Sequence, residues 1–304
     1  MIKRLLIYLF LMGVAYAAPS PNIVLIMVDD MGYSDIGCYG SEIQTPNIDA
    51  LASNGISFRE FYNTAKCYPT RACLLTGVYA HQTGTTGNGK NGFADTSGTK
   101  LKNSVTLGEV LRGAGYHTYA SGKHHSLDNL YDRGFDHYYG LRDGACNHFN
   151  PGLQRTDDSE PASKGDSFQR FWADDALVFN TRDPDYQNYF TEIGKDPDGN
   201  DRYSFYSTDA FTAKAQEYLT EWETQNTGRP FFLYLPYTAP HDPIMAWPED
   251  IAKYDGVYDV GYDTIRNARY QKQLTSGLLN ASQYPLSPAT YVESWSSLNQ
   301  SEKD

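Results

Sequence analysis

The chain has 304 residues, of which 40% are hydrophobic and 14% aromatic, and this composition is typical of a globular protein rather than a disordered one. The length allows a large buried core in one or two domains. The formal net charge of −12 argues against a nucleic-acid partner, because phosphate binding requires a basic surface, and four cysteines are too few for a disulfide scaffold.

Residues 1–17 have the pattern of a secretory signal peptide. Lys3 and Arg4 precede a short apolar run that ends in an Ala-Tyr-Ala sequence, as is typical of a cleavable leader. The apolar run is about half as long as a membrane-spanning helix, so we expect no stable membrane anchor. The sequence therefore predicts an exported protein in the periplasm, the extracellular medium or a lysosome-like compartment.

Strand-like and helix-like segments alternate along most of the chain. The first is a nearly continuous apolar run, which predicts a strand buried on both faces of a parallel sheet. Thr45 and Ser104 are expected N-caps of helices, and Gly55, Gly77 and Gly115 are expected to end helices. The expected elements are, in chain order, a strand over 22–28, a helix over 46–54, a strand over 56–61, helices over 70–76 and 104–114, a strand over 116–120, a helix over 209–223 and a strand over 231–235.

This alternation predicts an α/β fold with a mostly parallel central sheet flanked by helices. The range of about 143–208 is different, because it is rich in Asp, Asn, Gly and Tyr and has weak periodicity. We interpret that range as an irregular insertion or a lid-like segment.

Residues 67–77 carry the strongest chemical signal, with the sequence CYPTRACLLTG. Pro69 favours the start of a helix, so Cys67 is expected at a helix N-terminus, where unpaired N–H groups and the helix dipole attract anions. Arg71 adds a planar cation beside it. The segment therefore predicts a site for an anionic nucleophile or a sulfate group.

Two adjacent acids follow the first predicted strand. Neighbouring residues in a strand point to opposite faces, so Asp29 and Asp30 can share one cation only where the pleat breaks at the strand's carboxyl end. In open α/β sheets, ligands gather at that end. The pair is therefore a candidate metal site.

Together these segments resemble the type I sulfatases, an arylsulfatase-like family of the alkaline phosphatase-like superfamily. Residues 67–77 are similar to the family signature Cys-x-Pro-(Ser/Thr)-Arg followed by Leu-Thr-Gly, whose cysteine is oxidised to Cα-formylglycine. The resemblance implies that a formylglycine-generating enzyme converts Cys67, and that Asp29, Asp30 and residue 67 bind Ca²⁺. It also implies that 20–304, which follow the leader predicted at 1–17, form the N-terminal portion of a sulfatase domain.

Two later segments also resemble this family. Residues 122–125 are similar to its Gly-Lys-Trp-His sequence, which implies that Lys123 binds sulfate and that His125 lies near the formylglycine, with His124 in place of the usual tryptophan. Residues 231–241 resemble the strand and loop that bring His241 to the ester oxygen. The remaining histidines that we weighed are expected to be ordinary hydrogen-bonded residues: His117, His137 and His148.

The resemblance implies hydrolysis of a sulfate monoester of a small molecule or a carbohydrate. One hydroxyl of an aldehyde hydrate at residue 67 attacks sulfur, and the alcohol leaves with a proton from His241. His125 then deprotonates the second hydroxyl, which expels sulfate, while Arg71 and Lys123 neutralise charge on the sulfuryl oxygens.

Two features leave alternatives open. If Cys67 is converted, Cys38, Cys73 and Cys146 remain, an odd number, whereas a Cys67–Cys73 disulfide would remove the nucleophile. Ca²⁺ takes roughly six to eight oxygen ligands, and the Asp-Asn pair and second lysine of the family's later part are missing here. The sequence therefore predicts a domain that is incomplete at its C-terminus. The alternatives are a phosphate or phosphonate ester hydrolase of the same superfamily and an inactive truncated protein.

Overall fold

A computed structural model describes residues 20–83, 101, 103–149, 170–180, 192–195, 201–203, 205–288 and 293–303. The predicted signal peptide lies outside the described residues. Among the residues described, no helix combines the length and the apolar character needed to cross a membrane.

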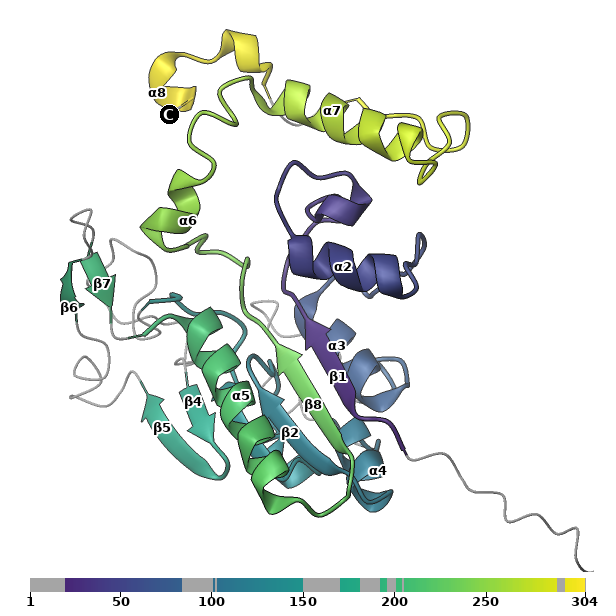
Figure 1. Ribbon diagram of the computed structural model, residues 1–304, viewed down its shortest axis with the longest axis vertical. Coiled ribbons are helices and arrows are strands. Elements are labelled where there is room, and N and C mark those ends of the chain that lie inside the picture. Colours follow the sequence, from purple (N-terminus) through teal and green to yellow (C-terminus); the bar gives the residue numbers. More distant parts are fainter. Residues whose placement is uncertain are drawn as a thin grey trace, which may run out of the picture.

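A six-stranded sheet forms the centre of the molecule, with the strand order β1-β8-β2-β3-β4-β5 (Figure 1). The first four strands in this order pair in parallel, and β4 and β5 are added antiparallel. The predicted α/β class with a mostly parallel sheet is therefore confirmed. The strands are β1 (Ile23–Met27), β2 (His117–Ser121), β3 (His137–Leu141), β4 (Arg170–Ala173), β5 (Ala176–Asn180) and β8 (Phe231–Pro236).

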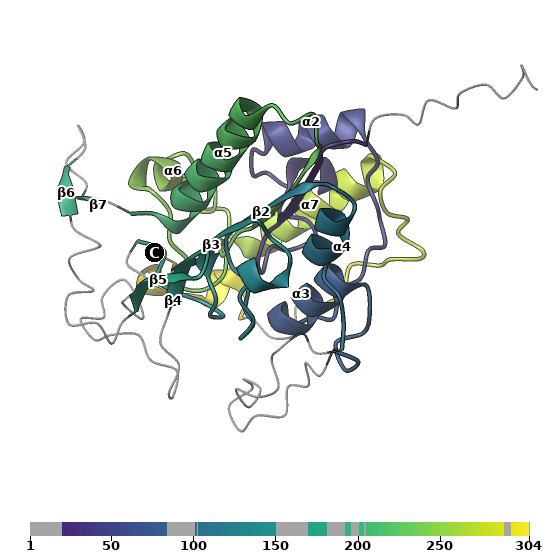
Figure 2. The same ribbon diagram turned by 90° about the horizontal axis from the view of Figure 1, so that it is seen from below.

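Helices cover both faces of this sheet, with α5 on one face and α3 and α4 on the other (Figure 2). A separate two-stranded sheet pairs β6 (Glu192–Lys195) with β7 (Asp201–Tyr203). The helices are α2 (Pro46–Asn54), α3 (Cys67–Thr76), α4 (Leu107–Gly113), α5 (Ser207–Gln225), α6 (Pro248–Ala252), α7 (Tyr262–Thr275) and α8 (Gln300–Lys303).

Strand β8 shows how the sheet separates two cores. Its residues alternate between the faces, as strand geometry requires. Phe231, Leu233 and Leu235 pack with α5, whereas Phe232 and Tyr234 pack on the side of α3 and α4. All six residues of β8 are buried, because both faces are covered at the centre of the sheet.

Strand β1 differs from the prediction that it is buried on both faces. Val24 and Ile26 are 50% and 51% exposed, while Ile23, Leu25 and Met27 pack against the core beneath α3 and α4. The reason is position, because β1 lies at the edge of the sheet and pairs only with β8 among the described strands. An apolar run therefore predicts that a strand has a buried face, but it does not show whether one face or both faces are covered.

Other local predictions also need correction. The described chain has no strand over 56–61, where Ile56 and Phe61 are 83% and 77% exposed. Residues with high β-propensity form a strand only where a partner strand is available. Helix α4 is capped by Thr106 rather than Ser104, since Thr106 and Glu109 form a reciprocal capping box. Helix α3 begins at Cys67 and ends, as expected, before the left-handed Gly77.

Four strands, β4 to β7, lie in the range of about 143–208, so part of the expected irregular insertion is regular structure. Its interpretation as a lid stays a prediction.

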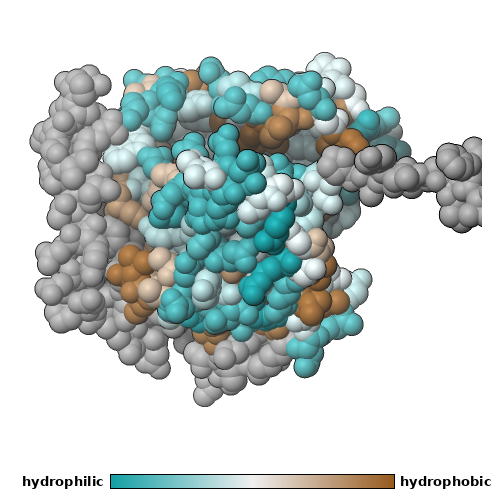
Figure 3. Space-filling view, turned by 60° about the horizontal axis from the view of Figure 1, so that its bottom comes forward, coloured by the Kyte–Doolittle hydropathy of each residue, from teal (hydrophilic) through white to brown (hydrophobic). Residues whose placement is uncertain are grey.

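On the face drawn in Figure 3, hydrophilic side chains predominate and hydrophobic ones form separate patches, as on an ordinary globular surface.

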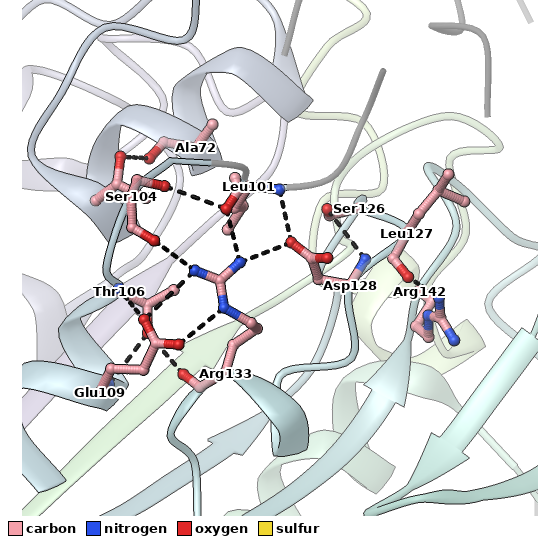
Figure 4. A network of polar contacts seen from close by, with 11 residues as sticks. Ala72, Leu101, Ser104, Thr106, Glu109, Ser126, Leu127, Asp128, Arg133 and Arg142 are labelled. Atoms are coloured by element: carbon pink, nitrogen blue, oxygen red, sulfur yellow. Dashed lines mark hydrogen bonds and ion pairs between the residues drawn. The ribbon is translucent and has the colours of Figure 1, made fainter. Parts of the chain in front are cut away.

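The loop that follows β2 is held in place by Arg133, which is the centre of a polar network (Figure 4). Arg133 Nη1 donates to Asp128 Oδ2 at 2.9 Å, and its Nε donates to Glu109 Oε1 at 2.9 Å. It also donates to the carbonyl oxygens of Leu101 and Ser104. The network ties the loop to the capped start of α4, and this loop begins with residues 122–125.

Candidate active site

The predicted site residues converge at the carboxyl ends of three neighbouring parallel strands. Asp29 follows β1, Lys123 follows β2 and His241 follows β8, so all three lie at one edge of the sheet. Main-chain hydrogen bonds hold these ends together, from Asp29 N to Ala239 O at 3.2 Å and from Lys123 N to Pro236 O at 2.7 Å.

A buried ion cluster forms the centre of the site. The Lys123 ammonium donates to the Asp29 carboxylate, and Arg71 Nη2 lies 3.4 Å from the same oxygen of Asp29. Arg71 Nη1 also donates to the Lys123 carbonyl oxygen at 2.6 Å. These residues are 3% exposed or less. Two cations thus share one carboxylate, and the excess positive charge favours an anion beside them.

Burial and the neighbouring Arg71 lower the pKa of Lys123, whereas Asp29 and Cys67 act in the opposite direction. Cys67 lies four residues before Arg71 on α3, so the two residues share one face of that helix. It is the first residue of α3, it is partly exposed, and its thiol is free. Cys73 is free as well, so the alternative of a Cys67–Cys73 disulfide is wrong.

His125 lies against the start of α3, with its ring edge-on to Tyr68 at a centroid distance of 5.6 Å. Burial lowers its pKa well below the usual value, and Lys123 and Arg71 lower it further. The imidazole is therefore neutral at pH 7. The ring also requires Gly144, because a Cβ at that position would come within 2.5 Å of His125.

His241 has acceptors at both ring nitrogens. Its Nδ1 lies 2.7 Å from the Asp242 carbonyl oxygen, and its Nε2 lies 3.5 Å from Asp30 Oδ2. The hydrogen bond at Nδ1 orients the ring, and Nε2 faces the carboxylate of Asp30.

His148 is a residue whose place in the site the sequence did not reveal. It is 1% exposed, and its Nε2 lies 3.1 Å from the His241 carbonyl oxygen, so Nε2 must carry the proton. Its Nδ1 then accepts from the Ser207 hydroxyl at 2.8 Å. His148 is hydrogen-bonded, as predicted, but it also anchors the main chain of His241. This arrangement could not be predicted from the sequence, because residues 148, 207 and 241 are far apart along the chain.

The described residues do not provide a complete calcium site. Asp29 is bound by Lys123 and Arg71, and Asp30 points its 61% exposed side chain toward solvent and His241. No group of three or more His, Cys, Asp or Glu side chains is arranged around a common point in the described part of the chain. Two carboxylates supply fewer oxygen atoms than Ca²⁺ needs, so the assignment of Asp29, Asp30 and residue 67 as metal ligands stays a prediction.

His124 is buried near cationic groups, and neither of its ring nitrogens has a hydrogen-bond partner among the residues that the structure describes. An unsatisfied buried polar atom costs roughly 1–3 kcal/mol, so we expect His124→Phe to raise the free energy of unfolding by about 1–2 kcal/mol. Urea unfolding at pH 7 measures this difference. A less stable variant would contradict the expectation.

The same substitution has an expected pH dependence. Burial, with nearby Arg142, lowers the pKa of His124 from 6.5 to about 3, so between these values the unfolded chain binds a proton that the folded chain does not. The wild type therefore loses stability as the pH falls below 6.5, and the advantage of the variant grows by about 2 kcal/mol from pH 7 to pH 5. An advantage that is equal at both pH values would contradict the assignment.

The sequence of the chain is similar to those of several known proteins. A protein-family model described as Sulfatase matches residues 21–294. The chain is 31% identical over 301 residues to an uncharacterized sulfatase of Schizosaccharomyces pombe, covering 93% of the chain and 49% of that protein. It is 30% identical over 286 residues to an arylsulfatase of Klebsiella aerogenes, covering 90% and 54%. The chain thus spans about half the length of these relatives.

Two solved structures are similar to the described fold. One is Ps i-CgsB in complex with k-i-k-neocarrahexaose, with a TM-score of 0.55, 30% identity and coverage of 85% of this chain and 53% of that one. The other is BT4656 in complex with its substrate D-glucosamine-2-N,6-O-disulfate, with a TM-score of 0.52, 28% identity and coverage of 77% and 37%.

Proposed function

Because the chain belongs to the sulfatase family, we propose that it hydrolyses sulfate monoesters with a formylglycine made from Cys67 as the nucleophile. The buried ion cluster carries this proposal. Lys123 and Arg71 share a single carboxylate beside the free thiol at the start of α3. A sulfate group carries the negative charge that would balance these cations.

The residues divide the proposed reaction between them. When Cys67 has been converted, the formylglycine supplies a hydrated aldehyde whose hydroxyl attacks sulfur. Arg71 and Lys123 bind the sulfuryl oxygens and neutralise charge that develops there. His241 donates a proton to the leaving alcohol oxygen, and the neutral His125 accepts a proton at residue 67.

The remaining parts of the proposal concern maturation and the substrate. A formylglycine-generating enzyme is the proposed partner that converts Cys67, and export follows from the predicted signal peptide at 1–17. The proposed substrate is a sulfated small molecule or carbohydrate, which the sugar complexes of Ps i-CgsB and BT4656 support. Ca²⁺ bound by Asp29, Asp30 and residue 67 stays part of the proposal, and no step above depends on it.

The test compares an aryl sulfate with the matching aryl phosphate on purified protein from a host that makes formylglycine. Peptide mass at residue 67 is measured on the same sample. We expect the sulfate ester to be cleaved faster and residue 67 to be an aldehyde. Preferential cleavage of the phosphate would favour the phosphate ester hydrolase, and full activity with an unmodified thiol would overturn the proposal.

A further inference from the structure

The proposed proton donor, His241, is held through its main chain as well as through its ring. Its amide N–H donates to the Thr238 carbonyl oxygen at 3.0 Å, which closes a turn just after β8. Its carbonyl oxygen lies 3.1 Å from Nε2 of His148. Because both main-chain polar groups of His241 have partners, the direction in which its side chain leaves the backbone is restricted.

His148 is itself fixed to the first residue of α5. The Ser207 main-chain N–H donates to the His148 carbonyl oxygen at 2.8 Å, and the Ser207 hydroxyl lies 2.8 Å from His148 Nδ1. His148 is 1% exposed and Ser207 is 0% exposed. Helix α5 packs on the sheet through buried residues such as Phe211. A chain of hydrogen bonds thus runs from the core, through His148, to the main chain of His241.

The bonds of His148 have a single direction. A carbonyl oxygen only accepts, so the bond to His241 requires a proton on Nε2 of His148. Burial lowers the pKa of His148, so its ring is neutral at pH 7 and Nδ1 is left as an acceptor. The Ser207 hydroxyl donates to Nδ1 and so stabilises the tautomer whose N–H faces His241. The other tautomer would place a lone pair against the His241 carbonyl oxygen and release it.

The residues next to this buried pair hold the far end of the same loop, which connects β8 with α6 (Figure 1). Phe149 stacks on Tyr206 with a centroid distance of 4.7 Å and meets Trp247 edge-on at 4.7 Å. The Tyr206 hydroxyl donates to the Met245 carbonyl oxygen at 3.1 Å. The loop over 237–247 is therefore held at two places by the same two segments of the chain, and the buried histidine is the contact that reaches the proposed acid.

We propose that His148 is a positioning residue, which holds the His241 main chain so that the His241 ring meets the leaving-group oxygen. The proposal rests on the proposed function, in which His241 donates a proton to that oxygen. A displacement of about 1 Å in a catalytic group can cost roughly 100-fold in rate, so loss of the bond from His148 should be visible in the kinetics. The loss should depend on the leaving group, because a poor leaving group needs the proton more than a good one.

The experiment compares phenyl sulfate, which has a poor leaving group, with 4-nitrophenyl sulfate, which has a good one, on protein made in a host that forms formylglycine. His148→Phe removes both side-chain hydrogen bonds and keeps a ring of similar size. We expect kcat/KM for phenyl sulfate to fall about 30-fold or more, and kcat/KM for 4-nitrophenyl sulfate less than about threefold. His148→Gln should restore most of the lost activity, because its amide N–H can donate to the same carbonyl oxygen. Ser207→Ala, which leaves the tautomer unfixed, should give an intermediate loss.

His117→Phe is the matched control. His117 is also a buried histidine with a side-chain hydrogen bond, to Thr227 Oγ1 at 2.9 Å. It is the first residue of β2, at the opposite end of this strand from the candidate site. The control should lower the temperature of unfolding, but the ratio of its two kcat/KM values should stay that of the wild type. Thermal unfolding also shows whether each variant is folded.

Amide hydrogen exchange at His241 gives a readout that does not depend on activity. The main-chain N–H of His241 should exchange at least about tenfold faster in His148→Phe than in the wild type, because its turn opens more often once the carbonyl oxygen is released. In His148→Gln the exchange should be as slow as in the wild type.

The outcomes separate this proposal from the proposed function. Equal losses for the two esters in folded His148→Phe would overturn the positioning role, as would a failure of His148→Gln to restore activity or unchanged exchange at His241. If the wild type cleaves neither ester, the proposed function fails, and the exchange rates still decide whether His148 holds His241.

Discussion

Cys67→Ala is expected to abolish sulfate-ester hydrolysis while the protein stays folded. The proposed nucleophile is made from this side chain, and removal of a catalytic nucleophile typically costs roughly 10⁴-fold or more in turnover. The fold should tolerate the change, because Cys67 is partly exposed, forms no disulfide and stands at the first position of α3. We expect the free energy of unfolding to change by less than about 1 kcal/mol.

Cys73→Ala is the matched control for this prediction. Cys73 belongs to the same helix and has a free thiol, but it packs toward the core that includes Ala72 and Leu75 rather than toward Lys123. Its substitution removes the same atoms and should keep the activity, even if the core loses some stability. Kinetics with an aryl sulfate and urea unfolding give the two readouts. Retained activity in Cys67→Ala, or equal losses in both variants, would contradict the role of residue 67.

That the candidate residues lie near one another was predictable from the sequence, because they follow parallel strands. The carboxyl ends of such strands meet at one edge, so Asp29, Lys123 and His241 come together although about 200 residues separate the first from the last. Local patterns also identified α3 and its end at Gly77, since a left-handed glycine is a strong signal for the end of a helix.

Features that depend on distant packing were not predictable in this way. The half-exposed face of β1 follows from its place at the edge of the sheet, and strand order is not written in the apolar run itself. The role of His148 depends on hydrogen bonds to Ser207 and to the carbonyl oxygen of His241, which meet only in the fold. The missing strand over 56–61 has the same cause, because a strand requires a partner and propensity does not supply one.

Asp29→Ala should be the most destabilising single substitution in the site. It leaves Lys123 and Arg71, which are 0% and 1% exposed, without their shared carboxylate. Removal of one partner from a buried ion pair typically costs about 3–5 kcal/mol, because the remaining charge stays desolvated. Asp30→Ala is the matched control. Its side chain is 61% exposed and faces His241 at 3.5 Å, so its loss should cost less than about 1 kcal/mol.

A double substitution separates unpaired charge from lost packing. If the cost arises from the uncompensated ammonium, Asp29→Ala with Lys123→Met should be more stable than Asp29→Ala alone, because methionine fills similar space without a charge. Inorganic sulfate should also stabilise Asp29→Ala more than the wild type, since an anion bound only to the folded state raises its stability. Urea unfolding with and without sulfate measures both effects. Additive losses in the double variant, together with no response to sulfate, would mean that Asp29 acts through packing and that the two cations do not form an anion site.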